Sequence, residues 1–175
     1  MIVMKSVMII SDGFEDLEVF TTASILRRAD VPLTIATLSS MVVTSSSGIR
    51  ITADMRVSEL DISEYDMILL PSFEGMENSQ KITSLVKEFN KDGKFIVAMS
   101  HAPIALAKAG VLENKLATVY DGMESKIPRP RDARIVIDGN IITSRSPSDV
   151  QELALKLVEI SQGKATAKRM RERLG

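Results

Sequence analysis

Short runs of consecutive apolar residues alternate along the chain with segments whose apolar residues recur every three or four positions. The runs at 7–10, 67–70 and 95–99 contain no charged side chain, which is typical of strands buried on both faces of a parallel sheet. Shorter or more mixed runs predict further strands at 33–37, 116–118, 135–137 and 141–143.

The segments between these runs carry the spacing of amphipathic helices. Residues 82–89 show an i, i+3, i+4, i+7 apolar stripe, which predicts a helix over 79–92. Further helices are predicted at 15–29, 102–109 and 150–161. The Ser-rich, β-branched stretch 41–53 predicts a small hairpin or edge strands, and the Asp-Gly-Asn sequence at 138–140 predicts a hairpin turn.

Strands that alternate with helices in this order predict an α/β protein. We expect a single-domain, doubly wound (flavodoxin-like) sandwich with a mainly parallel central sheet and helices on both faces. The domain is predicted to cover 1–163, followed by a basic helical tail at 164–175. A solvated final helix is the favoured interpretation of the tail, and a phosphate-binding or partner-binding role is the alternative.

Composition removes several classes of function. The 175 residues include no cysteine and one histidine, which excludes disulfides, thiolate metal sites and a multi-histidine zinc site. The formal net charge of −1 gives no indication of a nucleic-acid partner. No apolar run approaches the roughly 20 residues that span a bilayer. We therefore expect a cytoplasmic protein without a membrane partner, metal or cofactor.

The most informative candidate for chemistry follows the predicted strand 95–99. Ligands in open α/β sheets bind beyond the carboxyl ends of the strands. Ser100 lies there, between that strand and the next predicted helix, in the strand–turn–helix context of a nucleophile elbow. A serine that caps the helix is the structural alternative. The only histidine, His101, is a candidate general base if its ring reaches a hydroxyl.

An acidic cluster opens the predicted helix 15–29. Glu15 and Asp16 lie at the start of the helix, where the helix dipole stabilises negative charge, and Glu18 lies further into the helix. Glu18 is expected beside the elbow. A buried carboxyl at that position would have a raised pKa and could hydrogen-bond the elbow side chain.

Four stretches together resemble the ThiJ/PfpI superfamily, whose fold is class I glutamine-amidotransferase-like. They are 12–18 (DGFEDLE), 69–73 (LLPSF), 97–103 (VAMSHAP) and 143–147 (TSRSP). The histidine at 101 is similar to that of the PfpI-type intracellular protease branch. The resemblance implies that Ser100 occupies the position of a reactive cysteine and that Glu18 is its hydrogen-bond partner. It further implies that an acid from a neighbouring subunit, either Glu74 or Glu77, completes a site with His101.

The same resemblance implies ligand-binding or oxyanion-binding positions at Ser72, Phe73, Ala102 and Arg145. The chain departs from the family pattern at several of them. Serine replaces the cysteine at 100, alanine replaces a glycine at 102, and Ser72-Phe73 replaces a glycine pair. Val119 stands where another branch carries a histidine. These departures argue against thiol chemistry, because serine supplies no thiolate at neutral pH.

Three hypotheses for function follow. The first is a non-catalytic or weakly active member that binds a small metabolite at the elbow or acts as an oligomeric stress or regulatory protein. The second is a hydrolase of amide, peptide or ester bonds that uses Ser100, His101 and a glutamate. The third is a cysteine-dependent protease, glyoxalase or deglycase in which Ser100 is an engineered replacement. A homodimer or larger homo-oligomer is expected, with the hairpin region 39–53 as a candidate interface.

Overall fold

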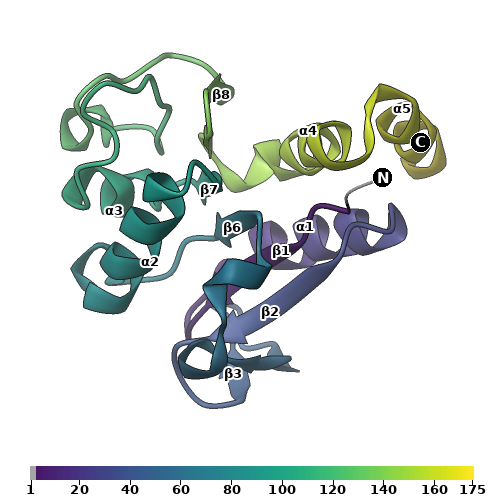
Figure 1. Cartoon of the computed structure of the whole chain (residues 1–175), viewed down its shortest axis with the longest axis horizontal. Helices are drawn as coiled ribbons and strands as arrows, with labels where there is room; N and C mark the ends of the chain where they lie inside the picture. The colour runs from purple at the N-terminus through teal and green to yellow at the C-terminus, as the bar shows by residue number, and fades with distance from the viewer. Residues whose placement is uncertain (1–2) are drawn as a thin grey trace.

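A seven-stranded sheet runs through the centre of the computed structural model, which describes residues 3–175 (Figure 1). The strands lie in the order β5-β2-β1-β6-β7-β9-β8, and only β8 is antiparallel to its neighbour. Their bounds are β1 (Ser6–Ile10), β2 (Leu33–Thr37), β5 (Met55–Arg56), β6 (Met67–Leu70), β7 (Phe95–Met99), β8 (Ile135–Asp138) and β9 (Ile141–Ser144). A separate antiparallel hairpin joins β3 (Val42–Thr44) and β4 (Arg50–Thr52).

Helices cover both faces of the sheet. The helices α1 (Asp16–Arg28), α4 (Val150–Gln162) and α5 (Lys164–Leu174) pack on one face. The other face carries α2 (Gln80–Lys91) and α3 (Pro103–Lys108). The predicted doubly wound α/β sandwich is therefore confirmed.

The period-two geometry of the strands divides the core into two halves. All five residues of β1 are buried, and their side chains alternate between the faces. Val7 and Ile9 enter the cluster beneath α2 and α3, whereas Met8 and Ile10 enter the cluster beneath α1 and α4. This two-sided burial is the reason that β1 appears in the sequence as a continuous apolar run.

Most of the predicted elements are confirmed, with boundaries that differ by one or two residues. The hairpin predicted in 41–53 forms as β3 and β4, and the turn predicted at 138–140 joins β8 and β9. The helix predicted at 15–29 begins one residue later, because Glu15 is its N-cap and accepts a hydrogen bond from the Glu18 N–H.

The prediction of a strand at 116–118 is wrong. Ala117 forms only an isolated bridge to Pro130, through hydrogen bonds that involve the backbone of Arg129 and Arg131. The Thr118 N–H instead donates to the Thr143 side-chain oxygen at 2.9 Å, so a side chain takes the place of a ladder bond. The short edge strand β5, which pairs with β2, was not predicted as a sheet strand.

The final helix packs on its predecessor. Met170 of α5 is 2% exposed, and Arg171 makes a bidentate ion pair with Glu152 of α4 at 2.7 and 2.9 Å. Among residues 3–175, no helix is long and apolar enough to cross a membrane.

Candidate functional site

The candidate site lies where the parallel strands β1, β6 and β7 end. Strands β1 and β6 are neighbours, but the chain continues from β1 to β2 on one side of this pair and from β6 to β7 on the other. Ligands of open α/β sheets bind at such a switch point, beyond the carboxyl ends of the strands. Glu18 comes from the helix that follows β1, Ser72 from the segment after β6, and Ser100 directly follows β7. Three segments that are distant in sequence therefore meet at one edge of the sheet.

Ser100 stands on a tight turn between β7 and α3. Its φ of +52° is left-handed, a conformation that costs a non-glycine residue roughly 1–2 kcal/mol. The backbone on both sides holds this turn, because the Ser100 N–H donates to the Ser144 carbonyl and the Ser100 carbonyl accepts from the Tyr120 N–H, each at 2.9 Å. The strand–turn–helix geometry expected for this segment is thus present.

Glu18 is a fully buried carboxyl with three hydrogen-bond donors. Its Oε1 accepts a short hydrogen bond from the Ser100 hydroxyl. Its Oε2 accepts from the Ser72 N–H at 2.6 Å and from the Ser72 hydroxyl at 2.8 Å. Burial raises the pKa of Glu18, and these hydrogen bonds oppose the increase only in part.

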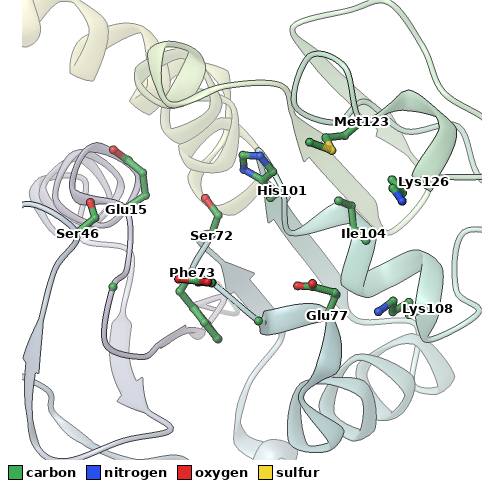
Figure 2. Close-up of a pocket in the computed structure, with 13 residues that line it drawn as sticks. Glu15, Ser46, Ser72, Phe73, Glu77, His101, Ile104, Lys108, Met123 and Lys126 are labelled. Atoms are coloured by element: carbon green, nitrogen blue, oxygen red, sulfur yellow. The ribbon is translucent and has the colours of Figure 1, made fainter.

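A cavity of about 570 Å³ opens above this cluster (Figure 2). Ser72, Phe73 and His101 are among the residues that line it. Ser100 does not line the cavity and is 1% exposed. Of the two hydroxyls bound to Glu18, only that of Ser72 belongs to a residue that faces the open space.

The cavity wall combines apolar and charged side chains. Ile104 and Met123 supply apolar surface, together with Phe73. The charged residues of the lining are Glu15, Glu74, Glu77, Lys108 and Lys126. Lys108 already donates to the Asn78 side chain at 2.9 Å. This mixture of an apolar wall and a few polar groups is typical of sites for small organic ligands.

His101 is an exposed residue that stacks on Tyr120. The two ring centroids are 4.4 Å apart, with an angle of 23° between the ring planes. Within residues 3–175 the imidazole makes no hydrogen bond to Ser100 or to any carboxylate. A nucleophile–base–acid arrangement is therefore not assembled by the described part of one chain.

The loop between β3 and β4 closes over the start of α1 at the edge of the cavity. The Asp16 carboxylate accepts hydrogen bonds from the Ser46 hydroxyl at 2.8 Å and the Ser47 hydroxyl at 2.6 Å, and a further one from Ser45. Burial alone would raise the pKa of Asp16, but these hydrogen bonds outweigh it and lower the pKa to about 2. Ser46 also lines the cavity.

Comparison with known proteins identifies the family. Residues 4–160 match the DJ-1/PfpI family. The chain belongs to the DJ-1/PfpI family. It is 32% identical over 169 residues to protein dj-1beta of Drosophila melanogaster, a match that covers 91% of this chain and 90% of the fly protein. The crystal structure of Drosophila DJ-1beta gives a TM-score of 0.93 at 30% identity, covering 99% of this chain and 98% of the fly chain.

Two other DJ-1/PfpI relatives differ in length and in name. Protein DJ-1 homolog A of Arabidopsis thaliana is 34% identical over 174 residues, which cover 93% of this chain but only 44% of the plant protein. A protein named a deglycase, from Thermococcus kodakarensis, is 27% identical over 164 residues, which cover 90% of this chain and 99% of the archaeal protein.

Within this DJ-1/PfpI fold, the predicted site residues fall into three groups. Glu18, Ser72 and Ser100 are brought together by direct hydrogen bonds. Four others line the cavity without a side-chain hydrogen bond to Ser100 in the described residues; they are Phe73, Glu74, Glu77 and His101.

The remaining two predicted ligand-binding residues do not line the cavity. The Ala102 N–H donates to the Met99 carbonyl at 2.9 Å, and the residue is buried. Arg145 forms ion pairs with Asp132 and Asp121 at the base of the loop that carries Tyr120. In this arrangement Arg145 holds the 120–126 segment of the cavity wall against the end of β9.

Ile104, Lys108, Met123, Lys126 and Tyr120 contribute to the site but were not predicted. Ile104 and Lys108 are four residues apart and therefore share one face of α3, while His101 lies in the turn just before this helix, so the spacing was a usable indication for Ile104 and Lys108. Met123 and Lys126 lie in an irregular connection, and no periodicity marks them. Among residues 3–175, no group of His, Asp and Glu side chains has the geometry of a metal site.

Proposed function

We propose that this DJ-1/PfpI family member binds a small organic molecule in the 570 Å³ cavity and does not perform thiol chemistry. The observation that carries this proposal is the position of Ser100, which is buried outside the cavity lining with its hydroxyl bonded to Glu18. A ligand in the cavity meets Ser72, Phe73 and His101 before it could meet Ser100.

The composition of the chain supports a binding role. It has no cysteine, so the thiolate needed for cysteine-based catalysis is absent. Phe73 adds a bulky apolar side chain to the inner cavity wall, which favours ligands with an apolar part. The His101–Tyr120 stack offers an aromatic edge at the same opening.

A Ser100 hydrolase is the second candidate. It is favoured by the left-handed φ of +52° at Ser100 and by the short hydrogen bond from its hydroxyl to a buried carboxyl. In this hypothesis His101 and either Glu74 or Glu77 complete the site across a subunit boundary. The cleaved bond would be an amide, peptide or ester.

We also propose a homo-oligomer, consistent with an oligomeric stress or regulatory protein. Leu17 at the start of α1 is 55% exposed, Val42 of β3 is 51% exposed and Ile49 beside β4 is 48% exposed. Leu17 directly follows Asp16, which binds the loop that leads to Ile49. The hairpin region 39–53 therefore remains our candidate interface.

A small-molecule screen by thermal shift tests the binding proposal. A ligand at 100 times its Kd stabilises the folded state by about 2.7 kcal/mol, enough for a clear increase in Tm. Ile104→Trp places a bulkier side chain in the cavity lining and should reduce the shift, whereas Ile137→Trp, on the exposed surface of β8, should retain it. Hits that bind the Ile104→Trp protein equally well would contradict the proposal. Stoichiometric labelling of Ser100 by a serine-directed phosphonate would favour the hydrolase.

A further inference from the structure

Glu18 accepts hydrogen bonds from two serine hydroxyls, and the two serines differ in their exposure to the cavity. The Ser100 hydroxyl bonds to Oε1, and the Ser72 hydroxyl bonds to Oε2 at 2.8 Å. Ser100 is buried at 1% exposure, whereas Ser72 is half-buried and lines the cavity. The hydroxyl that a cavity ligand can reach is therefore that of Ser72.

Ser72 is also held in place by its backbone. Its N–H donates to the same Oε2 atom at 2.6 Å, so the residue and the carboxylate are joined by two hydrogen bonds. This leaves the hydroxyl proton directed at a carboxylate oxygen and the oxygen lone pairs available to a bound molecule. A hydroxyl whose proton faces a base is the arrangement required for a serine nucleophile.

A second serine of the cavity provides a comparison within the same protein. The Ser46 hydroxyl also lines the cavity and also donates to a carboxylate, that of Asp16, at 2.8 Å. Four hydrogen bonds from Ser45, Ser46 and Ser47 lower the pKa of Asp16 to about 2, which makes it a weak base. Burial raises the pKa of Glu18, so Glu18 is the stronger base.

We propose that Ser72 is a nucleophilic hydroxyl that accepts an acyl group from a carboxylic ester bound in the cavity, with Glu18 as its general base. The inference rests on the proposed function in one respect, because the ester binds in the same cavity. It differs from the second candidate function in the identity of the reacting serine.

The reaction is an acyl transfer with a complete proton balance. The Ser72 oxygen forms a bond to the ester carbonyl carbon as its proton passes to Glu18 Oε2. The carbon–oxygen bond to the leaving alcohol then breaks, and Glu18 returns the proton to that alcohol. The products are an acyl ester on Ser72 and the free alcohol, and no oxidant or reductant is required.

Peptide groups next to Ser72 provide donors for the carbonyl oxygen. Within residues 3–175, the N–H groups of Phe73 and Glu74 have no hydrogen-bond partner. These are the unpaired donors nearest to Ser72 along the chain, and Gly75, with a φ of +79°, turns the segment directly after them. Such peptide donors stabilise the charge that develops on a carbonyl oxygen during acyl transfer.

Acetylation by 4-nitrophenyl acetate tests the proposal on the full chain. Release of 4-nitrophenolate gives the rate, and peptide mass mapping gives the modified residue. We expect acetyl on Ser72 and none on Ser46, and loss of that modification in Ser72→Ala. Glu18→Gln should slow the modification of Ser72 by about 100-fold, because it removes the base. Ser84→Ala, on the exposed side of α2, is the matched control.

Several results would overturn the inference. Acetyl on Ser100 would assign the reaction to the second candidate function, and acetyl only on His101 or on lysines would remove any role for Ser72. An unmodified, folded protein would also refute it. If the Glu18→Gln protein does not fold, the acetylation of Ser72 compared with that of Ser46 in the unsubstituted protein still tests the inference. The thermal-shift screen does not depend on acetylation, so failure of this inference and failure of the binding proposal are distinguishable.

Discussion

At the scale of single residues, Glu18 governs the electrostatics of the site. Removing a carboxylate from water raises its pKa, and three hydrogen bonds from Ser72 and Ser100 offset only part of that effect. The nearby Glu15 carboxylate raises the pKa of Glu18 further. The folded protein therefore binds a proton at Glu18 more tightly than the unfolded chain does.

This difference predicts a pH-dependent stability. Because the folded-state pKa of Glu18 is raised, its contribution to stability is fully present below about pH 4.5 and is lost as pH rises through the folded-state value. Glutamine does not titrate, so Glu18→Gln does not lose stability in this way. The free energy of unfolding of the Glu18→Gln protein minus that of the unsubstituted protein should therefore increase with pH. Urea denaturation between pH 4 and 8 measures the difference.

Glu113→Gln provides the control for the Glu18 experiment, since Glu113 is an exposed carboxylate without a hydrogen bond in the described chain. A pH-independent difference between Glu18→Gln and the unsubstituted protein would show that Glu18 titrates alike in the folded and unfolded states.

At the scale of elements, the β3–β4 hairpin is attached to α1 through one side chain. Asp16 occupies the first turn of α1 and binds three consecutive serines of the hairpin loop. Backbone hydrogen bonds reinforce the contact, with the Gly13 N–H donating to Thr44 and the Ser46 N–H donating to Phe14. The hairpin can therefore form one edge of the cavity although it is not part of the main sheet.

We predict that Asp16→Asn loosens this edge at neutral pH. The lowered pKa of Asp16 means that its contribution to stability is present above about pH 3.8 and is lost as pH falls through about 2. We expect Asp16→Asn to lower the free energy of unfolding by about 1 kcal/mol at pH 7, a value reduced for solvent screening. The difference should disappear near pH 2. Circular dichroism with urea, and limited proteolysis of residues 44–49, would measure it.

Asp92→Asn is the control for this effect, because Asp92 is an exposed residue at the end of α2. Equal proteolysis of the Asp16→Asn and Asp92→Asn proteins at pH 7 would mean that the serine contacts do not hold the hairpin.

At the scale of the whole molecule, the exposed apolar side chains are unevenly placed. Leu17, Val42 and Ile49 belong to the start of α1 and to the hairpin region, whereas Val3, Tyr120 and Ile137 lie in other parts of the chain. Exposed apolar side chains on elements that contact each other, as the hairpin loop and the start of α1 do, are more typical of an interface than an exposed side chain elsewhere is.

We predict that the purified protein is a dimer or a larger assembly. Leu17→Glu and Val42→Glu should each shift it toward the monomer, because each introduces a charge into an apolar contact. Ile137→Glu, which changes an equally exposed residue outside that surface, should leave the molar mass unchanged. Light scattering coupled to size-exclusion chromatography gives the masses. A monomeric unsubstituted protein at micromolar concentration would refute the prediction.

The periodicity of the sequence determined most of the fold. A strand buried on both faces is continuously apolar, and a helix packed on a sheet carries its apolar residues along one side. The local sequence pattern therefore predicted the strands β1, β6 and β7 and the helix α2. The failure at 116–118 has a non-local cause, since the Thr118 N–H donates to a side chain of β9 that no local pattern reveals. Glu18 and Ser100 were also named from the sequence as candidate site residues, through the strand–turn–helix context and the family resemblance, and the structure joins them by a hydrogen bond.

Only the tertiary structure decided how these residues act together. Glu18 meets Ser72 across 54 positions and Ser100 across 82, and the order of the strands is what brings them to one edge. Packing also decided that Ser100 is buried outside the cavity lining and that Ser72 is part of it. Access to a hydroxyl depends on what covers it in three dimensions, and neighbours in sequence do not determine that.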